Sequence, residues 1–247
     1  MKRIFLIGGY DLEMREILKI LEENEEKYID NKLAWGAKLS DYKKQIEEID
    51  KEFTIYALEL ERDIEFEKNI IFIDHHNKDS HKDSTLEQLA ELLNIKLTRE
   101  QKLIAENDKG YIPAMEKYGA TKEEISEIRK EDRKYQGVTE EDEKLAEKSI
   151  LENRKVCNGI TIVKSIGKKF SPICDRLYPV DKLIIYTDDE LNYYGKFSKE
   201  LYEKYENSYE VYSGGGENGY LGFKKKKLKI EEIKNIIEEI VKYVKSN

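Results

Sequence analysis

The chain of 247 residues has few cysteines, prolines and histidines and a single tryptophan. Its two cysteines, Cys157 and Cys174, lack metal-binding spacing, so we expect ordinary reduced thiols in a cytosolic protein. Three prolines, with abundant Lys, Glu, Ile and Tyr, are compatible with heat adaptation or with an AT-rich genome. The first apolar run ends too early, at Gly8-Gly9, for a signal peptide. No run approaches the roughly 20 apolar residues that cross a bilayer, so a membrane protein is not expected.

Negative charge outweighs positive charge, with 52 Asp and Glu against 44 Lys and Arg and a net charge of −8. Phosphate contacts along duplex DNA require clustered Lys and Arg, so a long duplex is a poor partner for this chain. Charged residues and hydrophobic residues each make up 39% of the chain, and the apolar share is enough for real cores. At this length the chain can form one large domain or two small ones.

Two of the three histidines stand side by side, and a single aspartate separates them from the apolar run 70–73. An unbroken apolar run that ends in charge is typical of a buried parallel strand. In an open α/β sheet, ligands bind at the carboxyl ends of such strands. Asp74, His75 and His76 therefore predict a site for a divalent metal and for an anion that the metal holds. The motif is short, so a polar strand end that merely starts a loop is the alternative.

Two acids follow the first predicted strand, 3–7, after a turn made by Gly8-Gly9. A helix is expected to begin here and to run over residues 12–28, with one apolar face. Asp11 and Glu13 would lie in or beside its first turn. They either cap the helix and favour its dipole or contribute to a site at this strand end.

Two more acids follow the predicted strand 53–58. Side chains alternate along a strand, so Glu59 and Glu61 are expected to share one face. If the sheet is parallel, one of these glutamates would end beside His75. A solvated acidic strand end is the alternative, and the sequence does not distinguish Glu59 from Glu61 as the residue that faces inward.

Asp108 lies where a helix does not favour an acid. A capping box formed by Thr98 and Gln101 predicts a helix that ends near Gly110. Negative charge near a helix C-terminus opposes the helix dipole. Because this position does not favour stability, we expect Asp108 to have a function.

The second half of the chain changes composition twice. Residues 121–153 are almost entirely polar and charged, which predicts two solvated helices with a break at 136–139. Sheet-like sequence returns from residue 159, and an amphipathic helix is expected over 230–244. A run of three glycines precedes that helix and could form a nest of N–H groups for an anion or simply a flexible hairpin loop. These glycines are Gly214, Gly215 and Gly216.

These patterns predict an α/β fold with two lobes. The N-terminal lobe has a mainly parallel sheet flanked by helices, and the C-terminal lobe is a smaller α/β unit. The expected divisions are a metal-binding domain over 1–120, a charged helical linker over 121–157, and a substrate-binding domain with the glycine-rich loop over 158–247.

The motifs together resemble the DHH phosphoesterases with their DHH-associated C-terminal domain. The resemblance is carried by Asp74-His75-His76 after a buried strand, the upstream Gly-Gly-x-Asp-x-Glu segment, Asp108, and the late Gly-Gly-Gly run. The family includes RecJ-like exonucleases, oligoribonucleases, cyclic-dinucleotide phosphodiesterases and family II pyrophosphatases. The resemblance covers nearly the whole chain in order. The Asp-His-His motif and the Gly-Gly-Gly run together are more specific than either alone.

The resemblance implies a role for each candidate residue. One or two Mn²⁺ or Mg²⁺ ions would be held by Asp11, Glu13, Glu59 or Glu61, Asp74, His75 and Asp108. His76 would act on the substrate phosphate, with Asp74 in support. The far end of the substrate would meet Gly214, Gly215, Gly216 and Asn218. The family places a histidine four residues before its first motif aspartate, and this chain has Ile7 there, so one metal site would lack a ligand.

The resemblance implies a hydrolase in which metal-activated water attacks a small phosphoester or a short di- or oligonucleotide. Ile7 supports an alternative, a catalytically degenerate relative that binds a nucleotide or a metal in a regulatory role. We expect a cytoplasmic protein with no membrane partner and no long duplex partner. The oligomeric state stays open, with a homodimer as one option.

Overall fold

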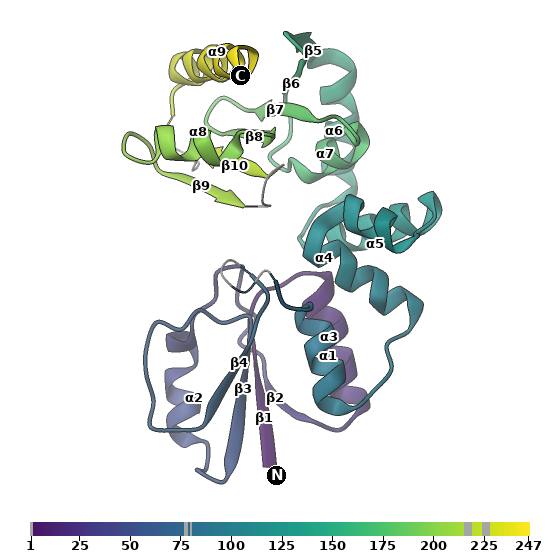
Figure 1. Cartoon of the computed structure of the whole chain (residues 1–247), viewed down its shortest axis with the longest axis vertical. Helices are drawn as coiled ribbons and strands as arrows, with labels where there is room; N and C mark the ends of the chain where they lie inside the picture. Colours follow the sequence, from purple (N-terminus) through teal and green to yellow (C-terminus); the bar gives the residue numbers. More distant parts are fainter. Residues whose placement is uncertain (1, 77–78, 80, 215–218, 224–227) are drawn as a thin grey trace. The chain divides into compact units, whose positions relative to one another are not determined.

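The computed structural model describes residues 2–76, 79, 81–214, 219–223 and 228–247. The chain forms two compact units, Met1–Gly137 and Val138–Asn247. Each unit has its own sheet with helices around it, which confirms the predicted α/β fold with a parallel sheet in the N-terminal half (Figure 1). The expected three-part division, with a linker over 121–157, stays a prediction.

Among the described residues, a four-stranded sheet forms the centre of the first unit. The strands lie in the order β2-β1-β3-β4, and every pairing is parallel. They are β1 (Lys2–Ile7), β2 (Lys27–Ile29), β3 (Phe53–Leu58) and β4 (Ile70–Ile73). The apolar runs on β1 and β3 are buried, as expected for central strands that are covered on both faces.

Helices cover both faces of this sheet (Figure 1). On one face lies α2 (Lys43–Glu48), whose Ile46 joins Leu6, Ile55 and Ala57 in an apolar cluster. On the other side lie α1 (Leu12–Glu23) and α3 (Thr85–Leu93), which pack against each other. The other helical segments of this unit are η1 (Leu39–Tyr42), α4 (Arg99–Tyr118) and α5 (Lys122–Tyr135).

Helix α1 ends earlier than its sequence pattern predicts. We expected the helix to continue to Tyr28, but it ends at Glu23 and the next residues form the edge strand β2. Glu25 adopts a positive φ of 53°, which turns the chain out of the helix. Strand β2 forms because it pairs with β1. The helical periodicity of the sequence depends only on neighbouring residues, so it could not predict this contact.

In the described part of the second unit, a six-stranded mixed sheet has the order β5-β6-β7-β8-β10-β9, in which β6 and β7 pair in parallel. Its strands are β5 (Arg154–Cys157), β6 (Ile160–Lys164), β7 (Lys182–Tyr186), β8 (Leu191–Gly195), β9 (Val211–Gly214) and β10 (Tyr220–Phe223). Its helices are α6 (Glu140–Asn153), α7 (Ser171–Leu177), α8 (Ser198–Tyr205) and α9 (Ile230–Ser246).

Both faces of this second sheet are buried. Neighbouring side chains of a strand point to opposite faces, so Ile162 and Ile184 pack with α8 and α9. Val163 and Ile185 pack with α6 and α7 on the other face. This two-sided burial explains why the central strands are continuous apolar runs rather than alternating ones.

Strands β5 and β10 of the second unit lie where no strand was predicted. All residues of β5 are exposed, and their polar composition matches the charged segment before them. Strand β10 lies within the stretch that we took for a glycine-rich loop, and it pairs with both β8 and β9. A Cβ atom on Gly222 would stand 2.1 Å from the ring of Tyr212, the residue it pairs with on β9. A larger residue at this position would displace the Tyr212 ring, so Gly222 makes room for a cross-strand neighbour and is not a sign of a flexible loop.

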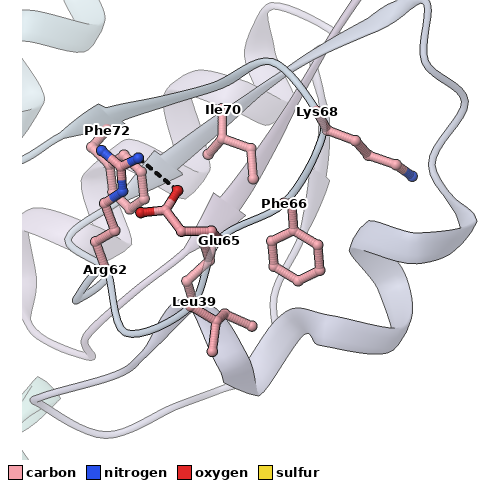
Figure 2. Close-up of a pocket in the computed structure, with 8 residues that line it drawn as sticks. Leu39, Arg62, Glu65, Phe66, Lys68, Ile70 and Phe72 are labelled. Atoms are coloured by element: carbon pink, nitrogen blue, oxygen red, sulfur yellow. Dashed lines mark hydrogen bonds and ion pairs between the residues drawn. The ribbon is translucent and has the colours of Figure 1, made fainter.

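A small hollow opens beside the start of edge strand β4 in the first unit (Figure 2). It is lined by Leu39, Arg62, Ile64, Glu65, Phe66, Lys68, Ile70 and Phe72. Its volume of about 50 Å³ is far below that of ordinary ligand pockets, roughly 300–1,000 Å³, so it is not a candidate binding site. No helix among the described residues combines the length and the apolar character needed to cross a bilayer.

Candidate metal centre

Three parallel strands of the first unit end level with one another. Ile7 at the end of β1 pairs with Leu58 at the end of β3, and Leu58 pairs with Ile73 at the end of β4. The residues that follow β1, β3 and β4 therefore lie at the same edge of the sheet. This register brings together the turn after β1, Glu59, and the Asp-His-His motif.

The turn after β1 requires glycine because it lies against the end of β3. A Cβ atom on Gly8 would stand 2.3 Å from the carbonyl oxygen of Leu58 and 2.5 Å from that of Glu59. These are backbone atoms, which cannot move aside. Only a residue without a side chain allows this approach, which brings the start of α1 next to Glu59.

The backbone of Glu59 turns its side chain into the unit. Strand β3 ends at Leu58, and Glu59 adopts a φ of 51°, which is uncommon for a residue with a side chain. The Glu59 side chain is 6% exposed. The Glu61 side chain is 61% exposed and lies 3.5 Å from Lys38 Nζ. The expected alternation, with both glutamates on one face, is wrong because the strand ends before Glu59.

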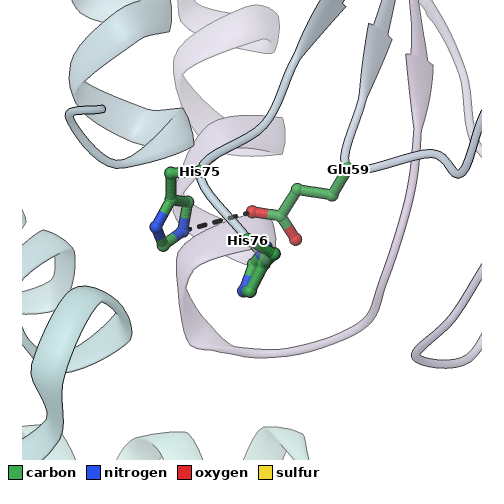
Figure 3. A group of neighbouring side chains, drawn as sticks. All are labelled: Glu59, His75 and His76. Carbon is green, nitrogen blue, oxygen red and sulfur yellow. Dashed lines mark ion pairs between the residues drawn. The ribbon is translucent and has the colours of Figure 1, made fainter. Parts of the chain in front are cut away.

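His75 lies among three carboxylates. Its Nε2 atom is 2.5 Å from Asp108 Oδ2, 3.6 Å from Glu13 Oε2 and 4.0 Å from Glu59 Oε1. One ligand atom from each of these four side chains lies within 4.8 Å of the others, so we call them the His75 cluster. Figure 3 shows the Glu59 carboxylate pointing toward His75 from the end of β3. Nitrogen and oxygen atoms at this spacing suit a divalent cation.

Glu13 is held so that one of its oxygens faces the cluster. Its Oε1 atom accepts a hydrogen bond of 3.1 Å from the backbone N–H of Leu86, in the first turn of α3. Its Oε2 atom is buried and has no hydrogen-bond partner among the described residues, and the same holds for Glu59 Oε1. Buried carboxylate oxygens without partners are unfavourable, and a cation between them would satisfy both. The side chains present therefore fit a bound metal ion.

The crowding of carboxyl groups raises their pKa values. Burial raises the pKa of Glu13 well above its ordinary value, and the negative charge of Asp108 adds to this effect. Burial and the charge of Glu13 raise the pKa of Glu59 in the same way. These shifts reflect the unfavourable free energy of keeping several acids ionised in a buried place without a counter-charge. A divalent cation supplies that counter-charge.

Asp11 caps α1 and also lies within electrostatic reach of the cluster. Its side chain accepts a hydrogen bond of 2.9 Å from the N–H of Met14, which bears out the capping interpretation. Burial and the charge of Asp108 raise the pKa of Asp11 to about 7. In the part of the chain that the structure describes, Asp11 is not among the side chains that share ligand distances.

Asp74 orients His76. The Oδ1 atom of Asp74 accepts a hydrogen bond of 2.8 Å from the backbone N–H of His76 and lies 3.0 Å from its Nδ1. The side-chain hydrogen bond raises the pKa of the His76 imidazole. The other ring nitrogen, Nε2, lies 3.9 Å from Asp108 Oδ2. His76 also forms a group with Glu59 and His75, whose potential ligand atoms lie within 4.8 Å of one another. Figure 3 shows these three side chains.

Asp108 comes from a helix that breaks directly after it. Helix α4 loses helical geometry at Gly110 and Tyr111 and then resumes to Tyr118. The first helical stretch ends at Gly110 as expected, but the chain kinks there and continues as a second helical stretch, and Tyr111 adopts a φ of 60°. The kink leaves Asp108 near the end of the first helical stretch, where its carboxylate meets His75.

Buried polar residues of α5 support this kink. Arg129 donates hydrogen bonds to Asn107 Oδ1 at 2.9 Å and to Asp132 Oδ2 at 2.6 Å. Its guanidinium lies 4.5 Å from the ring centroid of Tyr111. Arg129 and Asp132 are both buried, so the prediction of a solvated charged face is wrong on this side of α5. The hints in the sequence are Ile125 and Ile128, which lie four residues before Arg129 and Asp132 and therefore on the same helical face.

The predicted glycine-rich loop is described only in part. Gly214 is the last residue of β9. Gly215, Gly216 and Asn218 lie outside the described residues. Their assigned role in substrate binding stays a prediction.

No protein-family model matches the chain, and no curated protein matches it in sequence. Solved structures do match its fold. A pGpG-specific phosphodiesterase, PggH, from Vibrio cholerae shares 13% identity at a TM-score of 0.50, over 99% of this chain and 98% of that one. A DHH domain from a member of a family of ribosomal proteins shares 14% identity at a TM-score of 0.54, over 99% of this chain and 87% of that one.

A RecJ structure in complex with Mn²⁺, from Thermus thermophilus, shares 10% identity at a TM-score of 0.50, over 98% of this chain and 52% of that one. Each of these likenesses extends over nearly the whole chain and so includes both compact units. At such low identity they show a common fold and not a common activity. The resemblance found in the sequence is confirmed at that level, and the chain has the fold of the DHH phosphoesterase family.

Proposed function

We propose that this chain is a metal-dependent phosphoesterase that hydrolyses a small phosphoester or a short nucleotide. The observation that carries the proposal is the His75 cluster, in which three acids surround one imidazole. Two of its carboxylate oxygens, on Glu13 and Glu59, are buried without a hydrogen-bond partner among the described residues. The fold shared with a pGpG-specific phosphodiesterase and with RecJ supports the same class of reaction.

The metal would be held by Glu13, Glu59, His75 and Asp108, with Asp11 as a further nearby acid. Carboxylate oxygens with a single imidazole favour Mn²⁺ or Mg²⁺ over Zn²⁺. When bound, such an ion lowers the pKa of a coordinated water and neutralises charge on a phosphate. The chain's contribution is to hold the acids in place through Leu86, the glycine turn and the kink in α4.

His76 would bind the phosphate. Because Asp74 holds Nδ1 and raises the pKa of the ring, Nε2 can carry a proton and donate it in a hydrogen bond to a phosphoryl oxygen. This hydrogen bond strengthens as negative charge develops on the phosphoryl oxygens during the reaction. Asp74 acts through His76 and is therefore a positioning residue.

Ile7 bears on the number of ions and on a second candidate function. Its buried aliphatic side chain stands where the family's motif has a histidine. The four side chains of the His75 cluster supply donors for one ion, and the group that includes His76 overlaps with them. We therefore favour a single tightly held ion. Ile7 is also the observation that favours the second candidate, a relative that binds a nucleotide without hydrolysing it.

A short substrate agrees best with the charge of the chain. The net charge of −8 disfavours the many phosphate contacts that a long duplex would make. A metal ion can supply the positive charge that one or two phosphates require. The cytoplasmic location and the homodimer stay predictions.

Hydrolysis of a dinucleotide such as pGpG in the presence of Mn²⁺ tests the proposal. We expect turnover that a chelator abolishes, and a fall in kcat of about 100-fold or more in His76→Ala. Glu61→Gln removes an acid that lies outside the cluster, so this variant should keep the activity of the natural sequence. Tight nucleotide binding without turnover at the same Mn²⁺ concentration would favour the binding protein and overturn the hydrolase.

A further inference from the structure

The only tryptophan of the chain is exposed beside the metal centre. Trp35 is 69% exposed, although removal of a large apolar ring from water lowers the free energy of the protein. Its ring centroid lies 5.7 Å from that of His76, with the two planes at 84°. The indole therefore stands next to the residue that we assign to the phosphate, and most of its surface is open.

The loop that carries Trp35 is anchored to the strand ends. After Trp35 the chain turns at Gly36, which has a φ of 82°. Ala37 then accepts a hydrogen bond of 2.9 Å from the N–H of Glu61. On its other side the indole approaches the glycine turn, since a Cβ atom on Gly9 would lie 3.4 Å from Trp35 Cδ1. The position of the ring is thus set by the same turn and the same strand end that build the metal centre.

We propose that Trp35 stacks against the base of a nucleotide whose phosphate is bound at His76. This inference rests on the proposed function and narrows its substrate class from phosphoesters in general to nucleotides. A base and its phosphate are joined through one sugar, so a nucleotide can reach both side chains when they are in contact. A flat aromatic ring accepts any base on its face, and stacking needs no further hydrogen bonds.

Phosphate compounds without an aromatic ring gain no stacking interaction from Trp35. Pyrophosphate and simple sugar phosphates have no aromatic group to cover the indole. A nucleotide would remove from water both the face of its base and the face of the ring. The exposed state of Trp35 beside His76 is therefore explained by a ligand that carries an aromatic base.

The fluorescence of Trp35 reports on this contact directly, because no other tryptophan contributes. The full chain is titrated with GMP in Mg²⁺, which avoids quenching by paramagnetic Mn²⁺, and in parallel with ribose 5-phosphate. We expect GMP to change the emission saturably, at concentrations that match its calorimetric Kd, and ribose 5-phosphate to leave the emission unchanged. Emission that stays constant while GMP binds, or failure of GMP to bind, would overturn the inference.

Kinetics of Trp35→Ala provide a second readout. Loss of one stacked base should raise KM for a dinucleotide by about 5- to 100-fold while kcat changes by less than about 3-fold. The KM of Trp35→Phe should lie between that of the natural sequence and that of Trp35→Ala. Tyr118→Ala, which removes another exposed aromatic ring at the far end of α4, should leave KM unchanged. A dinucleotide that lacks the stacked base should be hydrolysed equally by the natural sequence and by Trp35→Ala.

The failures of the two proposals are distinguishable. If Trp35→Ala hydrolyses the intact dinucleotide with an unchanged KM, the stacking inference is wrong and the phosphoesterase stands. If the natural sequence hydrolyses no dinucleotide, the proposed function is wrong, and the GMP titration decides the stacking inference by itself.

Discussion

His75 and Asp108 are 33 positions apart in the chain, yet His75 Nε2 lies 2.5 Å from Asp108 Oδ2. The first residue follows the end of β4 and the second precedes the kink in α4. Burial lowers the pKa of His75, but the hydrogen bond to Asp108 and the charges of Asp108 and Glu59 outweigh it and raise that pKa above its ordinary value. An acid that is unfavourable for its own helix is thus held by a partner from another element.

Replacement of Asp108 by Asn keeps the shape of the side chain and removes its charge. Mn²⁺ at 100 times its Kd should add about 2.7 kcal/mol to the stability of the natural sequence. In a chain of this size that corresponds to a rise in Tm of about 5–10 °C. We expect Asp108→Asn to lose at least half of this rise, because the cluster has lost a charged ligand. Thermal unfolding with EDTA and then with Mn²⁺ measures the rise in Tm for the natural sequence and for Asp108→Asn.

The metal-free form of Asp108→Asn provides an internal control. In the metal-free form the substitution relieves the repulsion between Asp108 and the ionised Glu13, but it also removes the charge that stabilises protonated His75. Because these two effects oppose each other, the Tm of the metal-free variant should differ little from that of the metal-free natural sequence. Glu61→Gln should show the full rise with Mn²⁺. A full rise in Asp108→Asn would contradict its place among the ligands.

Replacement of Arg129 by Lys tests the support of the α4 kink. Lysine keeps a charge opposite Asp132 but loses the planar group that reaches Asn107 and covers Tyr111. We expect a loss of about 1–3 kcal/mol in the free energy of unfolding. Because Asn107 precedes Asp108, affinity for Mn²⁺ should also fall, by about 10-fold. Urea unfolding and calorimetric titration measure the two effects.

Arg62→Lys is the matched control for Arg129→Lys. Arg62 also lies over an aromatic ring, 5.6 Å from the centroid of Phe72, but at the hollow beside the start of β4. It should leave the affinity for Mn²⁺ unchanged. If Arg129→Lys lowers stability without any change in Mn²⁺ affinity, Arg129 supports the fold and does not position Asp108.

Glu87 makes stability depend on pH in the acid range. It accepts hydrogen bonds of 2.8 Å from Lys102 and from Lys109 and so ties α3 to α4. Burial raises the pKa of Glu87, but these hydrogen bonds outweigh it and hold the pKa at about 2. Since the folded-state pKa lies below the unfolded value of about 4.3, the stabilisation is complete above that value and is lost as the pH falls toward 2.

Glu87→Gln should therefore lower the free energy of unfolding by about 1–2 kcal/mol at neutral pH, a modest value because the lysines remain partly exposed. The difference from the natural sequence should shrink between about pH 5 and about pH 2. Urea unfolding across this pH range measures the difference in the free energy of unfolding between the two chains. Glu91→Gln, at an exposed position of the same helix, should follow the natural curve. A constant difference at all pH values would exclude the ion pairs as its cause.

Gly8→Ala should lower stability by about 3 kcal/mol or more, because the new methyl group would meet the backbone of Leu58 and Glu59. Gly119→Ala is the matched comparison. Gly119 has a φ of 89° and no atom within 4 Å of an added Cβ, so only the backbone conformation is unfavourable, at about 1 kcal/mol. Chemical unfolding of both variants gives the two values. Equal losses would show that the approach of the turn to β3 is not tight.

Local patterns were enough to predict much of the first unit. The strand 70–73 was expected from its apolar run, and the helix that starts at Arg99 was expected from the capping box of Thr98 and Gln101. The break between α5 and α6 was expected from the residues around Gly137. Such signals depend on residues that are neighbours in the chain, so they are visible before folding.

Which side chains meet was decided only by the tertiary structure. The sequence alone indicated that acids and imidazoles would follow parallel strands, because apolar runs and their polar ends are local features. The prediction that the strand 70–73 is buried was wrong, since β4 lies at the edge of the described sheet and Ile71 is 41% exposed. It could not choose Glu59 over Glu61, since that choice depends on where β3 ends and on the positive φ of Glu59. It also could not show that Arg129 is buried beside Asn107, because the register of strands and the packing of helices arise from contacts between distant segments.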